Sequence, residues 1–325
     1  MDGSSQAAGR ALDEFQWRMA DKLRRELGPQ ICGFLGQPNI IAIMLNPDGT
    51  LWVDRLGGDM EQVGTMSAMQ AEALVSTVAS TLGTTISRES PILECELPLD
   101  GSRFEAVVPP IVEAPTLTIR RNAAKEFTLA DYVSAGIMTI SQRIAIEHAV
   151  CDRQNILVVS SATAGKTTLT NAILQFMAKA SPTHRIVLIE DTTELQCSVP
   201  NHVDLLAVGN VSMLDCLRAC MRLKPTRIVV GEVRGAEAHT MLKAWNTGHP
   251  GGAATVHAND ALSGLIRLES LVAEATSAPQ QTLIAEAVDL VVFVDQEPEL
   301  KAGRKVREVA LVNGYSDGRY QVEFV

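Results

Sequence analysis

The chain has 325 residues, of which 46% are hydrophobic and 20% are charged. Because this composition supplies apolar material for packed cores, it excludes a globally disordered chain, and the length predicts two domains of ordinary size. The formal net charge of −10 disfavours a protein that coats nucleic acid or reads its sequence directly, since phosphate binding needs a basic surface.

The N-terminal segment predicts a helix, because apolar residues recur at helical spacing between Ala11 and Leu27. A helix on a membrane surface or at a subunit contact is one interpretation, and a helix packed on its own domain is the commoner one. Residues 1–10 lack the basic start and apolar core of a secretory signal. No apolar run in the chain reaches the roughly 18–20 residues that cross a bilayer.

Six cysteines are scattered along the chain without a CxxC spacing. In a chain of this length the pattern predicts reduced thiols of a cytosolic protein rather than a disulfide framework. Cys216 and Cys220 fall on one face of a predicted helix, but two ligands alone do not make a zinc site. We therefore interpret them as half-buried structural thiols.

The first half of the chain predicts a small α+β domain. A first strand pair is expected over 40–45 and 51–53, and a second over 92–97 and 104–108. A helix is expected between the pairs, over 66–82. Prolines and the basic pair Arg120-Arg121 follow, so the segment 115–129 is predicted as a linker. The predicted domains are therefore 1–114 and 130–325.

The second half alternates between helices and strands. Helices are expected over 141–153, 166–179, 213–221 and 236–245, and strands over 156–159, 186–189, 228–230 and 253–256. Continuous β-branched runs between amphipathic helices predict a parallel sheet covered on both faces. The tail 306–325, with turn residues at Asn313-Gly314 and Asp317-Gly318, predicts a closing hairpin.

The segment after the strand 156–159 has the form of a phosphate loop: strand, loop, Gly-Lys-Thr-Thr, helix. Backbone N–H groups at a helix N-terminus and the helix dipole favour an anion there. Lys166 would bring a point charge to the phosphates of ATP, and the Thr167 hydroxyl would hold Mg²⁺. An ordinary helix cap is the alternative for this segment taken alone. The predicted nucleotide-binding residues are Ser160, Ser161, Ala162, Thr163, Ala164, Gly165, Lys166, Thr167 and Thr168.

Polar side chains follow three further predicted strands: Glu190, Asp191 and Glu194, then Glu232, then His257. Ligands bind at the carboxyl ends of strands in open α/β sheets, so we expect these side chains to gather at one edge. Glu232 suits a carboxylate that polarises the attacking water, and His257 suits contact with the γ-phosphate. Glu190 is counted with them as catalytic, supported by Asp191 and Glu194. Helix caps and a structural histidine are the alternatives, but four clusters at four strand ends favour catalysis.

These segments resemble three boxes of the secretion and traffic ATPase superfamily, in the same order. Residues 190–195 (EDTTEL) resemble its Asp box, 227–235 (RIVVGEVRG) its Walker B, and 247–259 its His box. The strand pair around 44–53 also fits, so the resemblance covers nearly the whole chain. Within the superfamily the sequence is most similar to the TrbB-type conjugal transfer ATPases of the type IV secretion branch.

The resemblance implies an α/β fold: a RecA-like P-loop C-terminal domain with a parallel-rich sheet, preceded by a smaller α+β N-terminal domain. It implies a cytoplasmic homohexameric ring, peripheral at the inner membrane, that hydrolyses ATP with Mg²⁺ to power conjugal transfer or type IV secretion. The implied partners are the other secretion ATPases and the coupling protein.

The resemblance also adds residues to the candidate site. Nucleotide would lie between the domains near the linker, where Arg120 and Arg121 stand at the place of the family's basic residues. Arg218, Arg222 and Arg234 are further candidates for phosphate or intersubunit contact, and His249 is a companion of His257.

The loop departs from the family pattern Gly-Gly-Thr-Gly-Ser-Gly-Lys-Thr-Thr, because Ser160, Ser161 and Thr163 replace three glycines. A residue with a Cβ costs ~1–2 kcal/mol wherever such a position needs positive φ, and β-branched Thr163 costs more. A non-hydrolysing or loop-impaired scaffold subunit of the same apparatus is therefore the main alternative function. A small-molecule P-loop kinase and a direct DNA motor are weaker ones, because neither an acceptor site nor interleaved basic and aromatic residues are seen.

Overall fold

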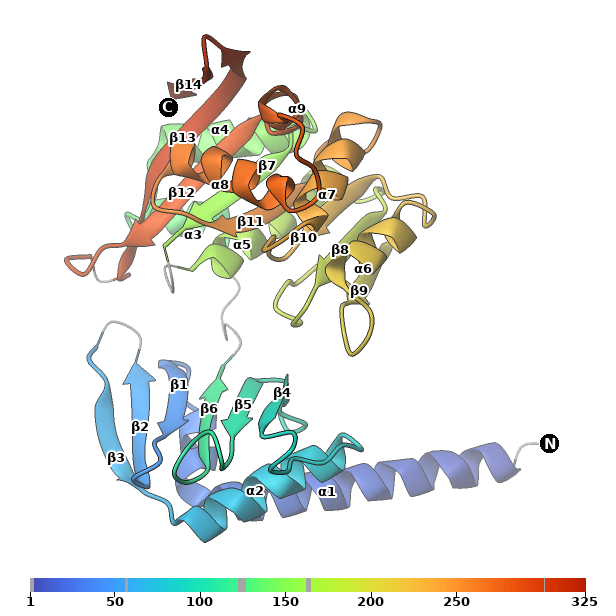
Figure 1. Ribbon diagram of the computed structural model, residues 1–325, viewed down its shortest axis with the longest axis vertical. Helices are drawn as coiled ribbons and strands as arrows, with labels where there is room; N and C mark the ends of the chain where they lie inside the picture. Colours follow the sequence, from blue (N-terminus) through green and yellow to red (C-terminus); the bar gives the residue numbers. More distant parts are fainter. Residues whose placement is uncertain (1–2, 56–57, 122–126, 162–164, 301) are drawn as a thin grey trace. The chain divides into compact units, whose positions relative to one another are not determined.

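The computed structural model describes residues 3–55, 58–121, 127–161, 165–300 and 302–325, with side chains from residue 17 onward (Figure 1). The chain divides into two compact units, Met1–Lys125 and Glu126–Val325. The division falls within the range 115–129 expected for a linker. Strand β6 (Thr116–Arg120) lies in the same range and belongs to the sheet of the N-terminal unit.

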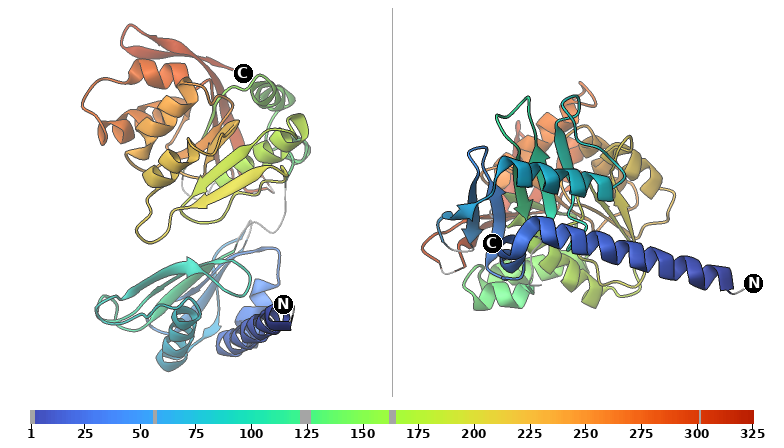
Figure 2. Two further views of the ribbon diagram at one scale, coloured as in Figure 1. Left: turned by 90° about the vertical axis from the view of Figure 1, so that its right-hand side faces the viewer. Right: turned by 90° about the horizontal axis from the view of Figure 1, so that it is seen from below.

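The N-terminal unit is a six-stranded antiparallel sheet with helices α1 (Gly3–Leu35) and α2 (Ala68–Thr81) packed together (Figure 2). The strand order is β3-β2-β1-β6-β5-β4. The strands are β1 (Ile40–Leu45), β2 (Thr50–Arg55), β3 (Glu61–Thr65), β4 (Ile92–Glu96), β5 (Arg103–Val107) and β6. Strands β3 and β6 were not predicted; the other elements lie where the sequence placed them.

Helix α1 is interrupted at Gly28, whose φ of 74° and ψ of 167° are not helical, and Pro29 follows. Leu23, Leu27 and Ile31 are buried in one cluster with the apolar face of α2 and the sheet. This part of α1 therefore packs on its own unit, as the commoner interpretation expected. Trp17, farther toward the N-terminus, is 65% exposed.

The C-terminal unit is built on an eight-stranded sheet of order β14-β13-β12-β7-β11-β10-β8-β9. The strands from β12 to β9 are parallel, and β13 and β14 are antiparallel. Their bounds are β7 (Ile156–Ser160), β8 (Ile186–Glu190), β9 (His202–Leu206), β10 (Arg227–Val230), β11 (Ala253–His257), β12 (Leu290–Gln296), β13 (Arg304–Ser316) and β14 (Arg319–Phe324).

Helices cover both faces of this sheet (Figure 1). One face carries α3 (Leu129–Ser134), α4 (Ile140–Cys151) and α5 (Lys166–Ala180); the other carries α6 (Met213–Cys220), α7 (Glu237–Asn246), α8 (Ala261–Ala273) and α9 (Gln281–Ala287). Alternate residues of β7 enter opposite cores, Ile156 and Val158 on one side and Leu157 and Val159 on the other. The doubly covered sheet explains why its strands read as continuous apolar runs.

Two details correct the sequence analysis. Asn313-Gly314 is not a turn: it lies inside β13, where the pairing with β14 shifts register between Val312 and Gly314, as in a β-bulge. The hairpin turns only at Asp317-Gly318, where φ is 54° and 74°. Cys216 and Cys220 are fully buried thiols in a core rather than half-buried ones.

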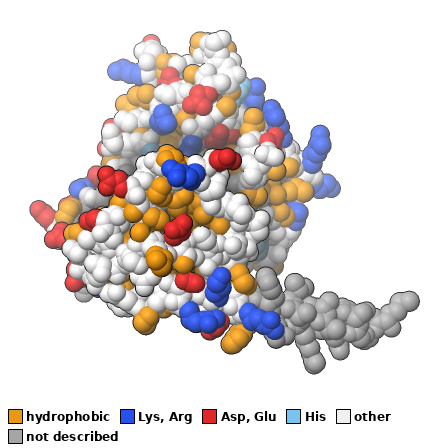
Figure 3. Space-filling model, turned by 60° about the horizontal axis from the view of Figure 1, so that its bottom comes forward, with side chains coloured by type: hydrophobic (Ala, Val, Ile, Leu, Met, Phe, Trp, Pro, Cys, Tyr) orange, Lys and Arg blue, Asp and Glu red, His pale blue; other side chains and the backbone are white. Residues whose placement is uncertain are grey.

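The surface carries charge of both signs. Figure 3 shows a face on which basic and acidic side chains lie beside a group of hydrophobic ones. In the N-terminal unit the large exposed apolar side chains are Trp17, Met60, Met69, Leu82, Ile92 and Ile111. Within the described residues, no helix combines the length and apolar character that crossing a membrane requires.

Candidate functional site

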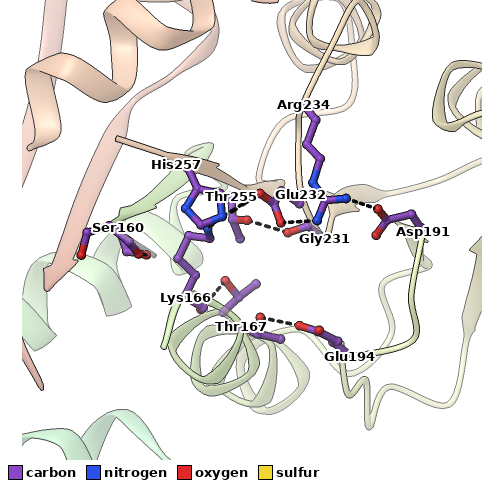
Figure 4. A network of polar contacts seen from close by, with 12 residues as sticks. Ser160, Lys166, Thr167, Asp191, Glu194, Gly231, Glu232, Arg234, Thr255 and His257 are labelled. Atoms are coloured by element: carbon purple, nitrogen blue, oxygen red, sulfur yellow. Dashed lines mark hydrogen bonds and ion pairs between the residues drawn. The ribbon is translucent and has the colours of Figure 1, made fainter. Parts of the chain in front are cut away.

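The carboxyl ends of four neighbouring parallel strands form the candidate site. Strands β7, β11, β10 and β8 lie side by side in this order, and Ser160 pairs with His257 at the ends of β7 and β11. Because side chains that follow such strands share one edge of the sheet, the residues predicted from separate boxes come together there. Figure 4 shows this cluster around Lys166 and Glu232.

Lys166 lies at the centre of the cluster. It is the first residue of α5 and follows Gly165, whose φ of 91° is the left-handed conformation that favours glycine. The Lys166 side chain is 8% exposed. Its ammonium nitrogen lies 2.6 Å from Nε2 of His257 and 3.8 Å from Oε1 of Glu232. The ammonium group therefore bridges the ends of β11 and β10.

Neighbouring charges set the protonation of Glu232 and His257, whose Oε1 and Nε2 are 3.0 Å apart. Burial opposes ionisation of Glu232, but a hydrogen bond from Arg234 and the charges of Lys166 and Arg234 together hold its pKa below the usual value. Burial, and then the charge of Lys166, lower the pKa of His257. Near neutral pH the lowered pKa values favour an ionised Glu232 carboxylate beside a neutral imidazole whose Nε2 lies against the Lys166 ammonium group.

Arg234 fixes the loop after β10. Its guanidinium donates to Oε2 of Glu232 at 2.9 Å and to a carboxylate oxygen of Asp191 (Figure 4). The Oε1 of Glu237 accepts from the backbone N–H groups of Arg234 and Gly235, at 2.7 and 2.9 Å. The Glu232 side chain is thus held by Arg234, whose own backbone is held by Glu237.

The acidic box after β8 meets the start of α5. The Thr167 hydroxyl donates to Oε2 of Glu194 at 2.7 Å. Glu190 is 7% exposed, and its Oε1 accepts from the backbone N–H groups of Glu194 and Leu195 at 3.1 and 2.9 Å. Burial raises the pKa of Glu190 to about 7, although those two hydrogen bonds act in the opposite direction. Glu190 therefore shapes the box through its backbone contacts, while Glu194 faces Thr167.

Two side-chain oxygen groups lie together at the start of α5, the Thr167 hydroxyl and the Glu194 carboxylate. The Thr167 hydroxyl and the Glu194 carboxylate already share a hydrogen bond, and oxygen ligands of this kind are those that Mg²⁺ prefers. Thr167 is the residue that would bind the cation directly, with Glu194 beside it.

Some predicted residues lie elsewhere. His249 precedes β11, at the opposite edge of the sheet from His257, and its Nδ1 is 3.0 Å from the carbonyl oxygen of Pro225. Arg218 on α6 is 3.8 Å from Asp215, and Arg222 is exposed just after that helix. The structure does not bring these three residues into the cluster.

The remaining predicted residues lie in the first turn of α5, in the N-terminal unit or outside the described residues. Thr168 belongs to α5 beside Thr167. Arg120 ends β6 with an exposed side chain, and Arg121 donates to the carbonyl oxygen of Gln37. Ala162, Thr163 and Ala164 lie outside the described residues.

Two residues at the site were given no role from the sequence. The buried Thr255 donates from its hydroxyl to the carbonyl oxygen of Gly231 at 2.7 Å, tying β11 to the loop that carries Glu232. The carboxylate of Asp295 accepts from the Ser161 hydroxyl. Asp295 follows an apolar run, as Glu190 and Glu232 do, and that pattern was the available signal.

Comparisons with known proteins agree with this geometry. A family model described as "Type II/IV secretion system protein" matches residues 42–306. The probable conjugal transfer protein TrbB of Sinorhizobium fredii (strain NBRC 101917 / NGR234) is 45% identical over 306 residues, which cover 94% of this chain and 93% of that protein. The conjugal transfer protein TrbB of Rhizobium radiobacter is 46% identical over 306 residues, 94% of each.

Among solved structures, the X-ray structure of the Legionella pneumophila ATPase DotB is similar in fold, with a TM-score of 0.63. The match covers 85% of this chain and 78% of that one at 20% sequence identity. It supports the predicted α/β architecture of a RecA-like unit after a smaller α+β unit.

Proposed function

Because the chain belongs to the type II/IV secretion system protein family, we propose that it is a Mg²⁺-dependent ATPase that powers conjugal transfer or type IV secretion. The reaction is hydrolysis of ATP to ADP and phosphate. The observation that carries the proposal is the arrangement at the start of α5, where Lys166 contacts both Glu232 and His257. A cation, an ionised carboxylate and a neutral imidazole thus face the helix N-terminus at which phosphate is favoured.

Lys166 changes partners when nucleotide binds. In the structure its ammonium group is occupied by His257 and Glu232. A γ-phosphate placed at the N-terminus of α5 offers oxygen acceptors of higher charge, so the ammonium group turns toward it. The exchange frees Nε2 of His257 to contact the γ-phosphate and Oε1 of Glu232 to accept from water.

Glu232 then orients and polarises the attacking water. Its pKa is held low, so the carboxylate is ionised and accepts a hydrogen bond from water throughout the neutral range. Arg234 keeps Oε2 occupied at 2.9 Å, which leaves Oε1 as the oxygen that faces the water. Bound Mg²⁺ would neutralise phosphate charge as the bond to the leaving group breaks, and the Thr167 hydroxyl would hold it beside Glu194.

The assembly that we propose is a homohexameric ring, cytoplasmic and peripheral at the inner membrane. Two relatives of high coverage are described as conjugal transfer proteins, which motivates the other secretion ATPases and the coupling protein as partners. The exposed Arg120, Arg218 and Arg222 are available for contacts with nucleotide or with a neighbouring subunit.

The deciding experiment measures ATP hydrolysis by the purified protein with and without Mg²⁺, beside a Lys166→Ala variant. Loss of the ammonium group is expected to lower the rate by about 10²-fold or more, because positioned charge at the phosphates is a large part of catalysis. Lys179→Ala, in the last turn of the same helix, is the matched control and should keep the parent rate. A Lys166→Ala variant as active as the parent would remove the proposed site.

Glu232→Gln distinguishes hydrolysis from binding. This variant should bind nucleotide but turn it over about 10²- to 10⁴-fold more slowly, since the amide does not take up a proton. Parent-like hydrolysis would exclude Glu232 from catalysis.

The non-hydrolysing scaffold remains the second candidate, favoured by the two serines that open the loop, Ser160 and Ser161. Such a subunit would bind nucleotide without turnover. Restoring glycine at 160, 161 and 163 would then raise hydrolysis if the loop alone is impaired, and would leave a pure scaffold inactive.

A further inference from the structure

The start of the phosphate loop is held by side chains. Ser160 ends β7 between two parallel neighbours, where it pairs with His257 of β11 and Val294 of β12. The Ser160 hydroxyl donates to the carbonyl oxygen of Ser161 at 2.6 Å. The Ser161 hydroxyl donates in turn to Oδ1 of Asp295, the residue that follows Val294. The two serines that replace glycine therefore each make a contact that glycine lacks.

The other end of the loop lies against the hairpin formed by β12 and β13. Arg304 begins β13 and pairs with Gln296 of β12, next to Asp295. Its guanidinium lies against Gly165: a Cβ on this glycine would be 3.1 Å from Cζ of Arg304 and closer still to Nη1. Gly165 thus needs to be glycine for its φ of 91°, and it is also the point where Arg304 packs.

We propose that the β12–β13 hairpin positions both ends of the phosphate loop, with Asp295 acting as a positioning residue through the Ser161 hydroxyl. The expected effect on nucleotide affinity rests on the proposed ATPase function, whereas the positioning of the loop can be tested without nucleotide. In this arrangement one side-chain hydrogen bond, from Ser161 to Asp295, links the start of the loop to β12.

The contact differs from an ordinary surface hydrogen bond because Asp295 is partly buried, near the end of a strand whose preceding five residues are buried. Losing the contact is expected to weaken nucleotide binding about fivefold to tenfold, the range of a typical hydrogen bond.

The test is a double-mutant cycle on Asp295 and Ser161, with mant-ATP and Mg²⁺ as the probe of affinity. Asp295→Ala and Ser161→Ala should each raise Kd about fivefold to tenfold, and the double variant should be no weaker than either single variant. Asp295→Asn keeps an oxygen that accepts from Ser161, so it should bind nearly as tightly as the parent. Glu299→Ala, which removes an exposed carboxylate from the β12–β13 connection, is the matched control and should leave Kd unchanged.

Three outcomes would overturn the inference: parent-like affinity of Asp295→Ala, multiplied losses in the double variant, or Asp295→Asn as weak as Asp295→Ala. The last result would mean that charge, rather than positioning, matters at this place.

Hydrogen exchange without nucleotide separates this inference from the proposed function. Peptides that contain Ser161 should exchange faster in Asp295→Ala and Ser161→Ala than in the parent, and at the parent rate in Glu299→Ala. If the parent binds no nucleotide, the ATPase proposal fails but this readout still decides the role of the hairpin. Parent-like exchange of these peptides in both Asp295→Ala and Ser161→Ala would refute the positioning role of the hairpin.

Discussion

Glu190 shows how the fold controls a single carboxyl group. Its side chain is 7% exposed, and burial raises its pKa from 4.5 to about 7. The backbone N–H groups of Glu194 and Leu195, at 3.1 and 2.9 Å, favour the ionised form but do not offset the loss of hydration. Near neutral pH this group is close to half-protonated, whereas the low pKa of Glu232 keeps that carboxylate charged.

The pKa of Glu190 predicts a pH dependence of stability. The folded chain binds the proton more tightly than the unfolded chain, so the free energy of unfolding should fall as pH rises from about 4.5 to about 7. The contribution is at most about 3 kcal/mol, at 1.36 kcal/mol per pKa unit.

Glu190→Gln removes this titration and keeps an acceptor for the two N–H groups. Relative to the parent, the variant should gain stability between pH 5 and 7.5, as measured by urea denaturation without nucleotide. Glu323→Gln on exposed β14 is the control. A constant difference between Glu190→Gln and the parent across this range would contradict the prediction.

At the scale of elements, the packing of α8 depends on a close approach of its backbone to the sheet. A Cβ on Gly264 would lie 2.6 Å from Cγ2 of Val159 in β7, so the helix backbone approaches the strand more closely than alanine permits. Leu265, Leu268 and Val272 of the helix are buried in the core on that face of the sheet.

Gly264→Ala is therefore expected to lower the free energy of unfolding by about 1–3 kcal/mol, although alanine is the better helix former. Gly33→Ala, in α1, has nothing within 4 Å of the added Cβ and should stabilise by up to about 1 kcal/mol. Urea denaturation followed by circular dichroism compares the two. If Gly264→Ala also raised the free energy of unfolding, α8 would have to shift on the sheet to accommodate the added Cβ.

The elements differ in how well the sequence predicts them. Strands β7, β8 and β10 are apolar throughout because both faces are covered, and such runs are recognisable. Strand β9 lies at the edge of the sheet and alternates exposed and partly buried residues. Over five residues this pattern is not distinguishable from that of many loops. Helix α8 was not predicted, although an Asp260 cap and leucines at helical spacing indicate it. The bulge at 313–314 mimics turn chemistry, so only the register of β13 with β14 separates the two.

At the scale of the whole molecule, the sequence predicts those site residues that directly follow recognisable parallel strands. Glu190, Glu232 and His257 follow apolar runs, and a parallel sheet brings such ends together. The neighbours of β7 are not readable in this way, because β12 lies beside it although nearly two thirds of the C-terminal unit separates them in sequence. Asp295 and Arg304 were missed for that reason. His249 was included because it belongs to the same box as His257, yet the length of β11 separates the two.

Arg227 joins several parts of the C-terminal unit and is fully buried. It donates to the carbonyl oxygens of Gly251 and Val150 at 2.8 and 2.9 Å and to Nδ1 of His184 at 3.0 Å. These contacts connect the start of β10 with α4, with the segment before β8 and with the segment before β11.

Arg227→Met is expected to destabilise the unit by about 3 kcal/mol or more, because it leaves buried carbonyl oxygens without their donor. Arg319→Met, on exposed β14, is the control and should change the free energy of unfolding by less than about 0.5 kcal/mol. Thermal and urea denaturation measure both. Parent-like stability of Arg227→Met would show that these carbonyl groups find other donors.

The strand order also governs what can form while the chain is being synthesised. Strand β7 leaves the ribosome before both of its neighbours, β11 and β12, whereas β8, β9 and β10 can pair with one another as soon as residue 230 is available. The strand that leads into the phosphate loop is thus the one whose hydrogen-bonding edges stay open longest, and all five of its residues are ones that the finished sheet buries. A nascent chain halted before residue 253 would expose this apolar strand without a partner, a state prone to association with other chains. The cluster around Lys166 can assemble only after β11, which carries His257, has emerged.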